Sequence, residues 1–136
     1  AAMGELLFGD GPRCAPLGVF DDDGVLLGFG SVRRYSPREA YDATGVAMVY
    51  LAPGATGRGL GRRLLARLED QAARNGFEVI LALVCTENVA SMTLFRKTGY
   101  EVAGILKGVG RKFGRRLDTA ILQKDLGHPG TGAPGG

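Results

Sequence analysis

The sequence predicts one α/β domain built on a mixed β-sheet with two helices, in the element order β-β-β-α-β-α-β-β. Short apolar runs that end at turn residues predict strands, and two stretches with apolar residues at helical spacing predict the helices. At 136 residues, 45% of them hydrophobic, the chain is long enough for one core. The domain is expected to cover residues 1–126, and the Gly/Pro-rich tail at residues 127–136 is expected to be disordered.

Three strands are predicted before the first helix. The run "APLGVFDDDGVLLGFGSV" predicts a β-hairpin in which Gly24 adopts a positive φ. A polar connector, "RRYSPREAYDAT", leads to "GVAMVYLAP", where both alternating sets of side chains are apolar. This third strand is therefore expected to be covered on both faces. The residues before Pro16 are expected to form a loop, with a strand at residues 5–8 as the alternative.

The remaining elements follow from spacing and stop signals. A helix is predicted from Gly59 to Asn75, because apolar residues recur at every fourth position: Leu60, Leu64, Leu68 and Ala72. Next come a buried strand, "FEVILALVC", and a shorter helix, "NVASMTLFRKTG", with Ala90, Leu94 and Phe95 facing inward. Two final strands are expected to join near residues 113–115.

Composition narrows the function classes. No apolar run reaches the roughly 18 residues of a membrane span, and the N-terminus "AAMGELLFGDG" does not read as a signal peptide. The two cysteines lie in no metal-ligand spacing, so a reduced, cytoplasmic protein without a metal site is expected. Residues 1–57 carry a net charge of −3 and residues 58–136 one of +6. The basic residues are neither clustered nor interleaved with aromatics, which argues against nucleic acid as the partner.

The glycine-rich segment at residues 54–61 lies where the positive half begins and directly before the predicted helix. The first turn of a helix has free N–H groups that attract anions. Glycine at positions 57, 59 and 61 would let a phosphate approach the main chain, and Arg58 and Arg62 would add charge. The alternative is a plain glycine-rich turn next to a solvated helix face. The segment lacks the Gly-Lys-Ser/Thr of a nucleotide P-loop.

Two motifs resemble a known family. "GRGLG" after an apolar strand resembles the acetyl-CoA pyrophosphate loop of the GNAT superfamily of N-acetyltransferases. The stretch "ENVASMTLFRKTGYEVAGILKGVGRKFGRRLDTAILQKDL" is similar to the end of its phosphinothricin and methionine sulfoximine acetyltransferase subfamily, in which "GRKFGRxLD" is distinctive. The resemblance covers residues 16–126.

The resemblance implies transfer of an acetyl group from acetyl-CoA to a small amine by direct attack, without an acyl-enzyme, so Cys85 is not expected to act as a nucleophile. It also implies which residues bind. Those implied for acetyl-CoA are Val49, Tyr50, Leu51, Thr56, Gly57, Arg58, Gly59, Leu60, Gly61, Arg62, Asn88 and Lys97. Those implied for the acceptor are Arg38 and Tyr35, with Arg33 and Arg34 as candidate helpers.

Four positions depart from the subfamily pattern. Thr56 replaces a loop Arg or Gln, Ser36 replaces one of two acceptor-binding arginines, Val46 replaces a glutamate base, and Phe95 replaces a tyrosine or histidine acid. No catalytic residue is therefore assigned. The nearest candidates for the base by sequence are Glu39, Tyr41, Asp42 and Glu87.

The superfamily normally begins with a strand and one or two helices that this sequence lacks before Pro16. Their absence would expose an apolar patch on the sheet, and a homodimer is expected to cover it. Two other functions stay open. One is a degenerate CoA-binding module without turnover, and the other is a protein or peptide acetyltransferase.

Overall fold

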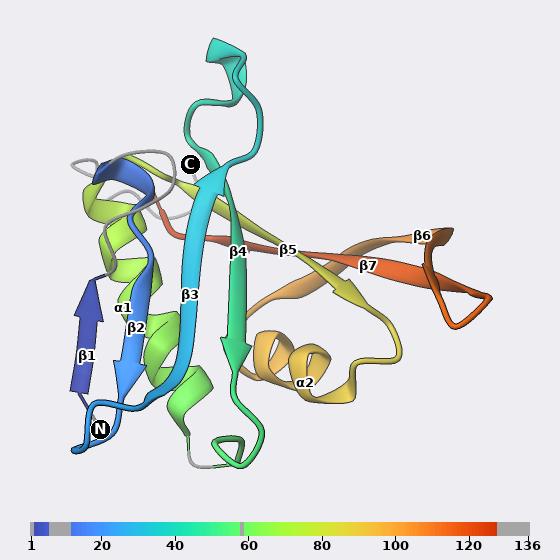
Figure 1. The fold of residues 1–136 in the computed structure, drawn as a ribbon. Coiled ribbons are helices and arrows are strands. Elements are labelled where there is room, and N and C mark those ends of the chain that lie inside the picture. Colours follow the sequence, from blue (N-terminus) through green and yellow to red (C-terminus); the bar gives the residue numbers. More distant parts are fainter. Residues whose placement is uncertain (1, 6–11, 58, 128–136) are drawn as a thin grey trace.

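The computed structural model of the chain describes residues 2–5, 12–57 and 59–127. Seven strands form one sheet in the order β1-β2-β3-β4-β5-β7-β6, and two helices accompany it (Figure 1). The strands are β1 (Ala2–Glu5), β2 (Leu17–Phe20), β3 (Leu26–Arg34), β4 (Thr44–Leu51), β5 (Val79–Cys85), β6 (Glu101–Lys112) and β7 (Arg115–Asp125). The helices are α1 (Leu60–Arg74) and α2 (Val89–Lys97), with short 3-10 turns η1 (Pro12–Cys14) and η2 (Glu39–Tyr41).

The predicted mixed sheet and element order are confirmed, with β1 as an added edge strand. Gly24 has the expected positive φ of 82° in the β2–β3 turn. The strand considered at residues 5–8 begins earlier, at Ala2, and its last three residues lie outside the described part of the chain, as does all but Gly127 of the predicted tail. Neither described helix has the length and apolar character needed to cross a membrane.

Helix α1 packs along one face of the sheet. Its apolar stripe is fully buried, and Leu64, Leu65 and Leu68 have no exposed surface. Glycine on β3 allows this close approach, because a Cβ at Gly30 would lie 2.7 Å from Leu68 Cδ1. The helix therefore rests almost directly on the β3 main chain.

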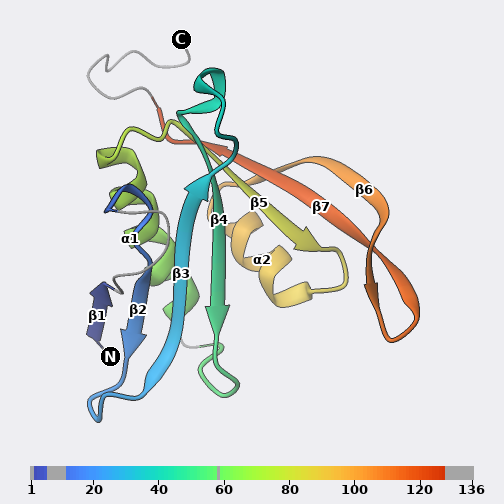
Figure 2. The ribbon, with the colours of Figure 1, turned by 45° about the horizontal axis from the view of Figure 1, so that its top comes forward.

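Helix α2 lies on the same side of the sheet, under β5 and β7 (Figures 1 and 2). Asn88 caps it by accepting a hydrogen bond from the Ser91 N–H, at 3.1 Å. Phe95 is buried as predicted, but Ala90 is exposed, so the prediction that Ala90 faces inward is wrong. The helix packs against the core through Met92, Leu94 and Phe95, and its first two residues are exposed.

The opposite face of the sheet carries neither described helix (Figure 2). Alternation along β4 directs Ala47 into the core, while Met48 and Tyr50 point to this open face and are each 48% exposed. The prediction that β4 is covered on both faces is therefore wrong for its C-terminal half. With Leu83 of β5, which is 55% exposed, these two side chains form what we call the apolar patch.

Candidate functional site

The sheet opens between β4 and β5. The two parallel strands pair from Thr44–Val79 to Ala47–Ala82 and no further. Beyond this point β4 stays paired with β3, and β5 stays paired with β7. The strands consequently diverge toward their C-terminal ends, as both ribbon views show (Figures 1 and 2).

The main chain of β4 faces this opening at every second residue. At the ends of the β3–β4 ladder, the Tyr35 N–H donates to Thr44 O at 2.9 Å and the Ala52 N–H donates to Leu27 O at 2.8 Å. Antiparallel partners exchange hydrogen bonds at alternate residues, so the even-numbered residues of β4 bond to β3. The N–H and C=O groups of Val49 and Leu51 therefore point toward β5, where no described strand pairs with them.

The β5 side of the opening is built in the same way. The Thr86 N–H donates to Asp118 O at 3.0 Å and the Leu126 N–H to Glu78 O at 2.7 Å, so even-numbered residues of β5 bond to β7. Beyond the last pair, the Leu83 carbonyl and the main-chain groups of Cys85 consequently face β4. A chain with amides of its own could enter the opening and hydrogen-bond to these edges as an added strand would. The pantetheine arm of CoA fits this requirement, and sequence reasoning did not identify the β5 side.

The glycine-rich loop lies at the end of β4 and leads into α1. Gly54, Gly57 and Gly59 have φ angles of 87°, 80° and 73°, and a Cβ at any of them would meet nothing within 4 Å. Gly59 is the N-cap of α1 and provides no side-chain cap, and no acidic residue lies in the first turn. The first helical hydrogen bond runs from the Arg63 N–H to Gly59 O, at 3.1 Å. The open surface and preceding N–H groups suit an anion such as a diphosphate.

Gly61 has a different role from the one predicted. It is buried, and a Cβ there would lie 3.3 Å from both Leu51 Cδ1 and Leu94 Cδ2. Its missing side chain therefore lets α1, β4 and α2 meet and does not clear a path for a phosphate. The Leu60 side chain is also buried, so both residues can contact a ligand only through their main chains.

The remaining predicted cofactor residues surround the loop and α2. Thr56 and Arg62 are exposed at the start of α1, and Arg58 lies outside the described residues. Asn88 follows β5 and uses its Oδ1 to cap α2, which leaves its Nδ2 as the group for a ligand. Lys97 is exposed in the last turn of α2.

The positions expected for a base and an acid carry no titratable group. Val46 lies on the open face beside Leu81, its partner on β5. The Phe95 ring packs edge-on against Tyr100, with centroids 4.9 Å apart. Tyr100 does not replace the acid, because its hydroxyl donates to Glu69 at 2.8 Å. Burial, together with the Glu69 charge, raises the pKa of Tyr100, so its hydroxyl keeps its proton.

The four candidate bases lie on the segments that flank β4 and β5. Glu39, Tyr41 and Asp42 belong to the β3–β4 connector, which precedes the N-terminal end of β4. Glu87 follows β5 and is paired with Arg115 at 2.7 Å, an interaction that raises the pKa of the arginine. Three of these groups therefore lie beyond the N-terminal end of β4, and the fourth, Glu87, is held in an ion pair with Arg115.

The predicted acceptor residues lie on the same connector. The rings of Tyr35 and Tyr41 meet edge to face, with centroids 5.7 Å apart, and both are about half exposed. Arg38 follows Pro37 and is exposed. Tyr35 and Arg38 thus share one end of β4, while the glycine-rich loop lies at the other. The opening between β4 and β5 begins between these two groups.

Comparison with known proteins agrees with this geometry. A model of the acetyltransferase (GNAT) family matches residues 3–100. A phosphinothricin N-acetyltransferase from Alcaligenes faecalis is 40% identical, over 90% of this chain and 66% of the relative. An L-methionine sulfoximine/L-methionine sulfone acetyltransferase from Salmonella typhimurium is 37% identical, over 82% of this chain and 65% of the relative.

A solved structure is also similar to this chain. A putative acetyltransferase from Salmonella typhimurium, determined with its cofactor acetyl-CoA, superimposes with a TM-score of 0.79 at 35% identity. That similarity covers 85% of this chain and 66% of the solved one. The chain thus spans about two thirds of the length of the relatives that it matches. With the diverging strands and the glycine-rich loop, these similarities show that the chain belongs to the acetyltransferase (GNAT) family.

Proposed function

We propose that the chain is an acetyl-CoA-dependent N-acetyltransferase that acts on the amine of a small amino-acid-like substrate. The observation that carries this proposal is the opening between β4 and β5, which continues into an uncapped glycine-rich helix start. In this proposal the loop main chain holds the diphosphate and the edges of β4 and β5 hold the pantetheine arm. The names of two relatives support acceptors of the phosphinothricin and methionine sulfoximine type.

The chemistry follows from where the thioester would lie. Val49 provides the first outward N–H beyond the last β4–β5 pair, and a donor there stabilises the negative charge that develops on the carbonyl oxygen. The amine nitrogen forms a bond to the acetyl carbon, the carbon–sulfur bond breaks, and CoA leaves as a thiolate. Because Val46 and Phe95 cannot exchange protons, water takes the ammonium proton and protonates the thiolate.

The acceptor would reach from the opening to the connector. Five residues of β4, about 17 Å along the strand, separate Thr44 from Val49. An acceptor with its amine at Val49 would lie within this distance, with its acidic group directed toward the connector and Arg38. Arginine suits such a group because its planar guanidinium binds carboxylate and phosphinate oxygens in pairs.

Two measurements test the proposal in sequence. We expect acetyl-CoA to raise the thermal unfolding midpoint, because a ligand that binds only the folded state stabilises it. We then expect release of free CoA thiol with phosphinothricin or methionine sulfoximine as acceptor. A shift without turnover of small amines or peptides would favour the non-catalytic module, and turnover of peptides alone would favour a protein acetyltransferase. No shift at saturating acetyl-CoA would contradict the proposal.

The pH dependence provides a further prediction. We infer that none of the described residues acts as the base, so that the rate depends on the fraction of acceptor that is already a free amine. We expect kcat/KM to rise about tenfold per pH unit up to the pKa of the acceptor amine. Steady-state rates between neutral and alkaline pH, with two acceptors of different amine pKa, check this. An inflection that stays at the same pH for both acceptors would reveal a protein base.

We also infer that a second copy covers the apolar patch. Met48, Tyr50 and Leu83 are exposed on the same face of the sheet, and exposed apolar surface of this kind commonly marks an association site. Light scattering after gel filtration should give a dimer mass, and Leu83→Glu should shift it toward the monomer. Val25→Glu is the matched control, because Val25 is 57% exposed but lies in the β2–β3 turn. A monomer mass for the unmodified chain would rule out the dimer.

A further inference from the structure

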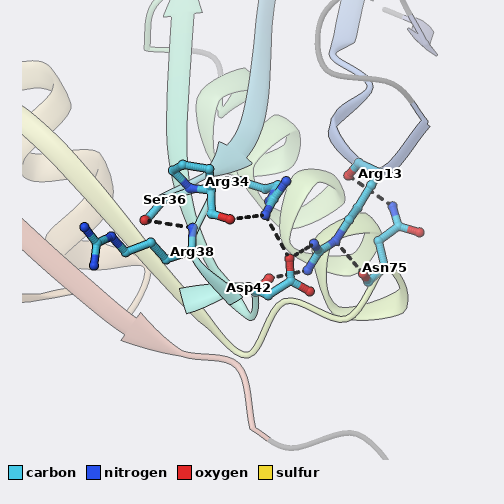
Figure 3. A network of polar contacts seen from close by, with 7 residues as sticks. Arg13, Arg34, Ser36, Arg38, Asp42 and Asn75 are labelled. Atoms are coloured by element: carbon cyan, nitrogen blue, oxygen red, sulfur yellow. Dashed lines mark hydrogen bonds and ion pairs between the residues drawn. The ribbon is translucent and has the colours of Figure 1, made fainter. Parts of the chain in front are cut away.

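A network of charged contacts holds the β3–β4 connector around Asp42 (Figure 3). Arg13 Nη1 donates to Asp42 Oδ1 at 2.8 Å, and its Nη2 donates to the Asp42 main-chain carbonyl. Arg34 Nη2 lies 3.4 Å from the same carboxylate oxygen and donates to Pro37 O at 3.2 Å. Two arginines from different parts of the chain thus converge on one aspartate.

Arg13 links the β3–β4 connector to the C-terminal end of α1 and to the residue pair before β5. Its Nε donates to Asn75 O at 3.1 Å, and its guanidinium lies 4.1 Å from the centre of the buried Phe77 ring. Asn75 is the C-cap of α1, and Phe77 precedes β5. Because the Arg13 side chain is only 28% exposed, it is held between α1 and the connector. Asp42 is the connector residue through which this anchor acts.

Arg38 lies on the same connector but outside the network. Its main chain is fixed, because its N–H donates to Ser36 Oγ at 3.2 Å and its carbonyl accepts from the Tyr41 N–H at 3.0 Å. Its side chain points away from Asp42, whereas those of Arg13 and Arg34 point toward it (Figure 3). Asp42 therefore binds Arg34, one of the candidate helpers for the acceptor, and leaves the Arg38 guanidinium directed elsewhere.

We propose that Asp42 is a positioning residue that fixes the connector so that Arg38, and not Arg34, meets the acidic group of the acceptor. This inference rests on the proposed function and adds a division of roles among the arginines. Asp42 touches neither the acceptor nor acetyl-CoA, and it acts through the direction that it gives to Arg38. The acceptor class that this arrangement selects is an amine that also carries a carboxylate, phosphinate or similar anion.

Steady-state kinetics of the full chain with phosphinothricin test the inference. Asp42→Asn should raise the KM for phosphinothricin about tenfold, with kcat and the KM for acetyl-CoA unchanged. Arg13→Gln should act in the same direction, because Arg13 reaches the connector through Asp42. Asp42→Glu should recover most of the affinity. Asp22→Asn, a change of the same chemistry at an exposed aspartate in the β2–β3 turn, should have no effect.

The double variant decides between positioning and simple stabilisation. Asp42→Asn combined with Arg38→Gln should bind phosphinothricin no more weakly than Arg38→Gln alone, because Asp42 acts only through Arg38. If the double variant loses phosphinothricin affinity by the product of the two single losses, the inference is overturned. It is also overturned if Asp42→Asn lowers the affinity for acetyl-CoA as much as that for phosphinothricin. If turnover is absent, calorimetric titration of phosphinothricin into the CoA-saturated protein provides the same comparison. Acetyl-CoA binding without any phosphinothricin binding would overturn this inference and leave the cofactor site standing.

Discussion

Gly59→Glu should weaken acetyl-CoA binding on the order of a hundredfold or more. Gly59 begins α1 with a φ of 73° in open space, so a glutamate there would place its carboxylate where the diphosphate is proposed to bind. Two like charges at one helix start repel each other, and the carboxylate would also take the free N–H groups of the first turn. The measurement is the shift of the unfolding midpoint over a range of acetyl-CoA concentrations.

Gly59→Ala is the matched control for this change. Both variants place a side chain on a left-handed residue, which costs about 1 kcal/mol of folding stability, and neither Cβ meets a neighbouring atom. We expect the alanine variant to keep most of the affinity, because its methyl group carries no charge. If the glutamate variant binds acetyl-CoA as tightly as the alanine variant does, the glycine-rich loop is not the diphosphate site.

Gly30→Val should destabilise the fold by about 2 kcal/mol or more, because it overfills the interface between α1 and the sheet. A Cβ at Gly30 would lie 2.7 Å from both Leu68 Cδ1 and the main-chain oxygen of Met48. The leucine could move, but the carbonyl belongs to β4 and could move only with the strand. The same change should therefore also weaken acetyl-CoA binding, because Val49 follows Met48.

Gly104→Val provides the comparison for Gly30→Val. Gly104 is also a strand glycine, in β6, but a Cβ there would meet nothing within 4 Å. Since valine favours extended backbone, this variant should be as stable as the parent chain. Denaturant unfolding of the two variants checks the contrast, and equal losses of stability would show that α1 does not depend on the glycine at position 30.

Local patterns predicted the elements that form the site. The four-residue repeat from Leu60 to Ala72 fixed the helix, because such a stripe can be buried only as one face of a helix. The glycine-rich segment predicted an uncapped helix start, and Gly57 and Gly59 have the open surroundings that this requires. These features depend on neighbours in the sequence, so they could be predicted without knowledge of the fold.

Other features depend on parts of the chain that meet only after folding. Gly61 resembled its neighbouring glycines, but Leu51 and Leu94 fill the space beside it. The strand pattern alone predicted that β4 is covered on both faces, whereas the resemblance led us to expect an exposed apolar patch, because the exposure of Met48 and Tyr50 depends on what covers a whole face of the sheet. The Arg13–Asp42 pair joins residues 29 positions apart, with no local signal at either of them.

A crystal structure of the chain with acetyl-CoA tests the central claim most directly. It should show the diphosphate at the main-chain N–H groups between Thr56 and Arg62, with the pantetheine arm hydrogen-bonded to Val49 and Leu51 in the opening between β4 and β5. A nucleotide bound elsewhere, or β4 and β5 closed against each other with the thioester outside, would contradict it.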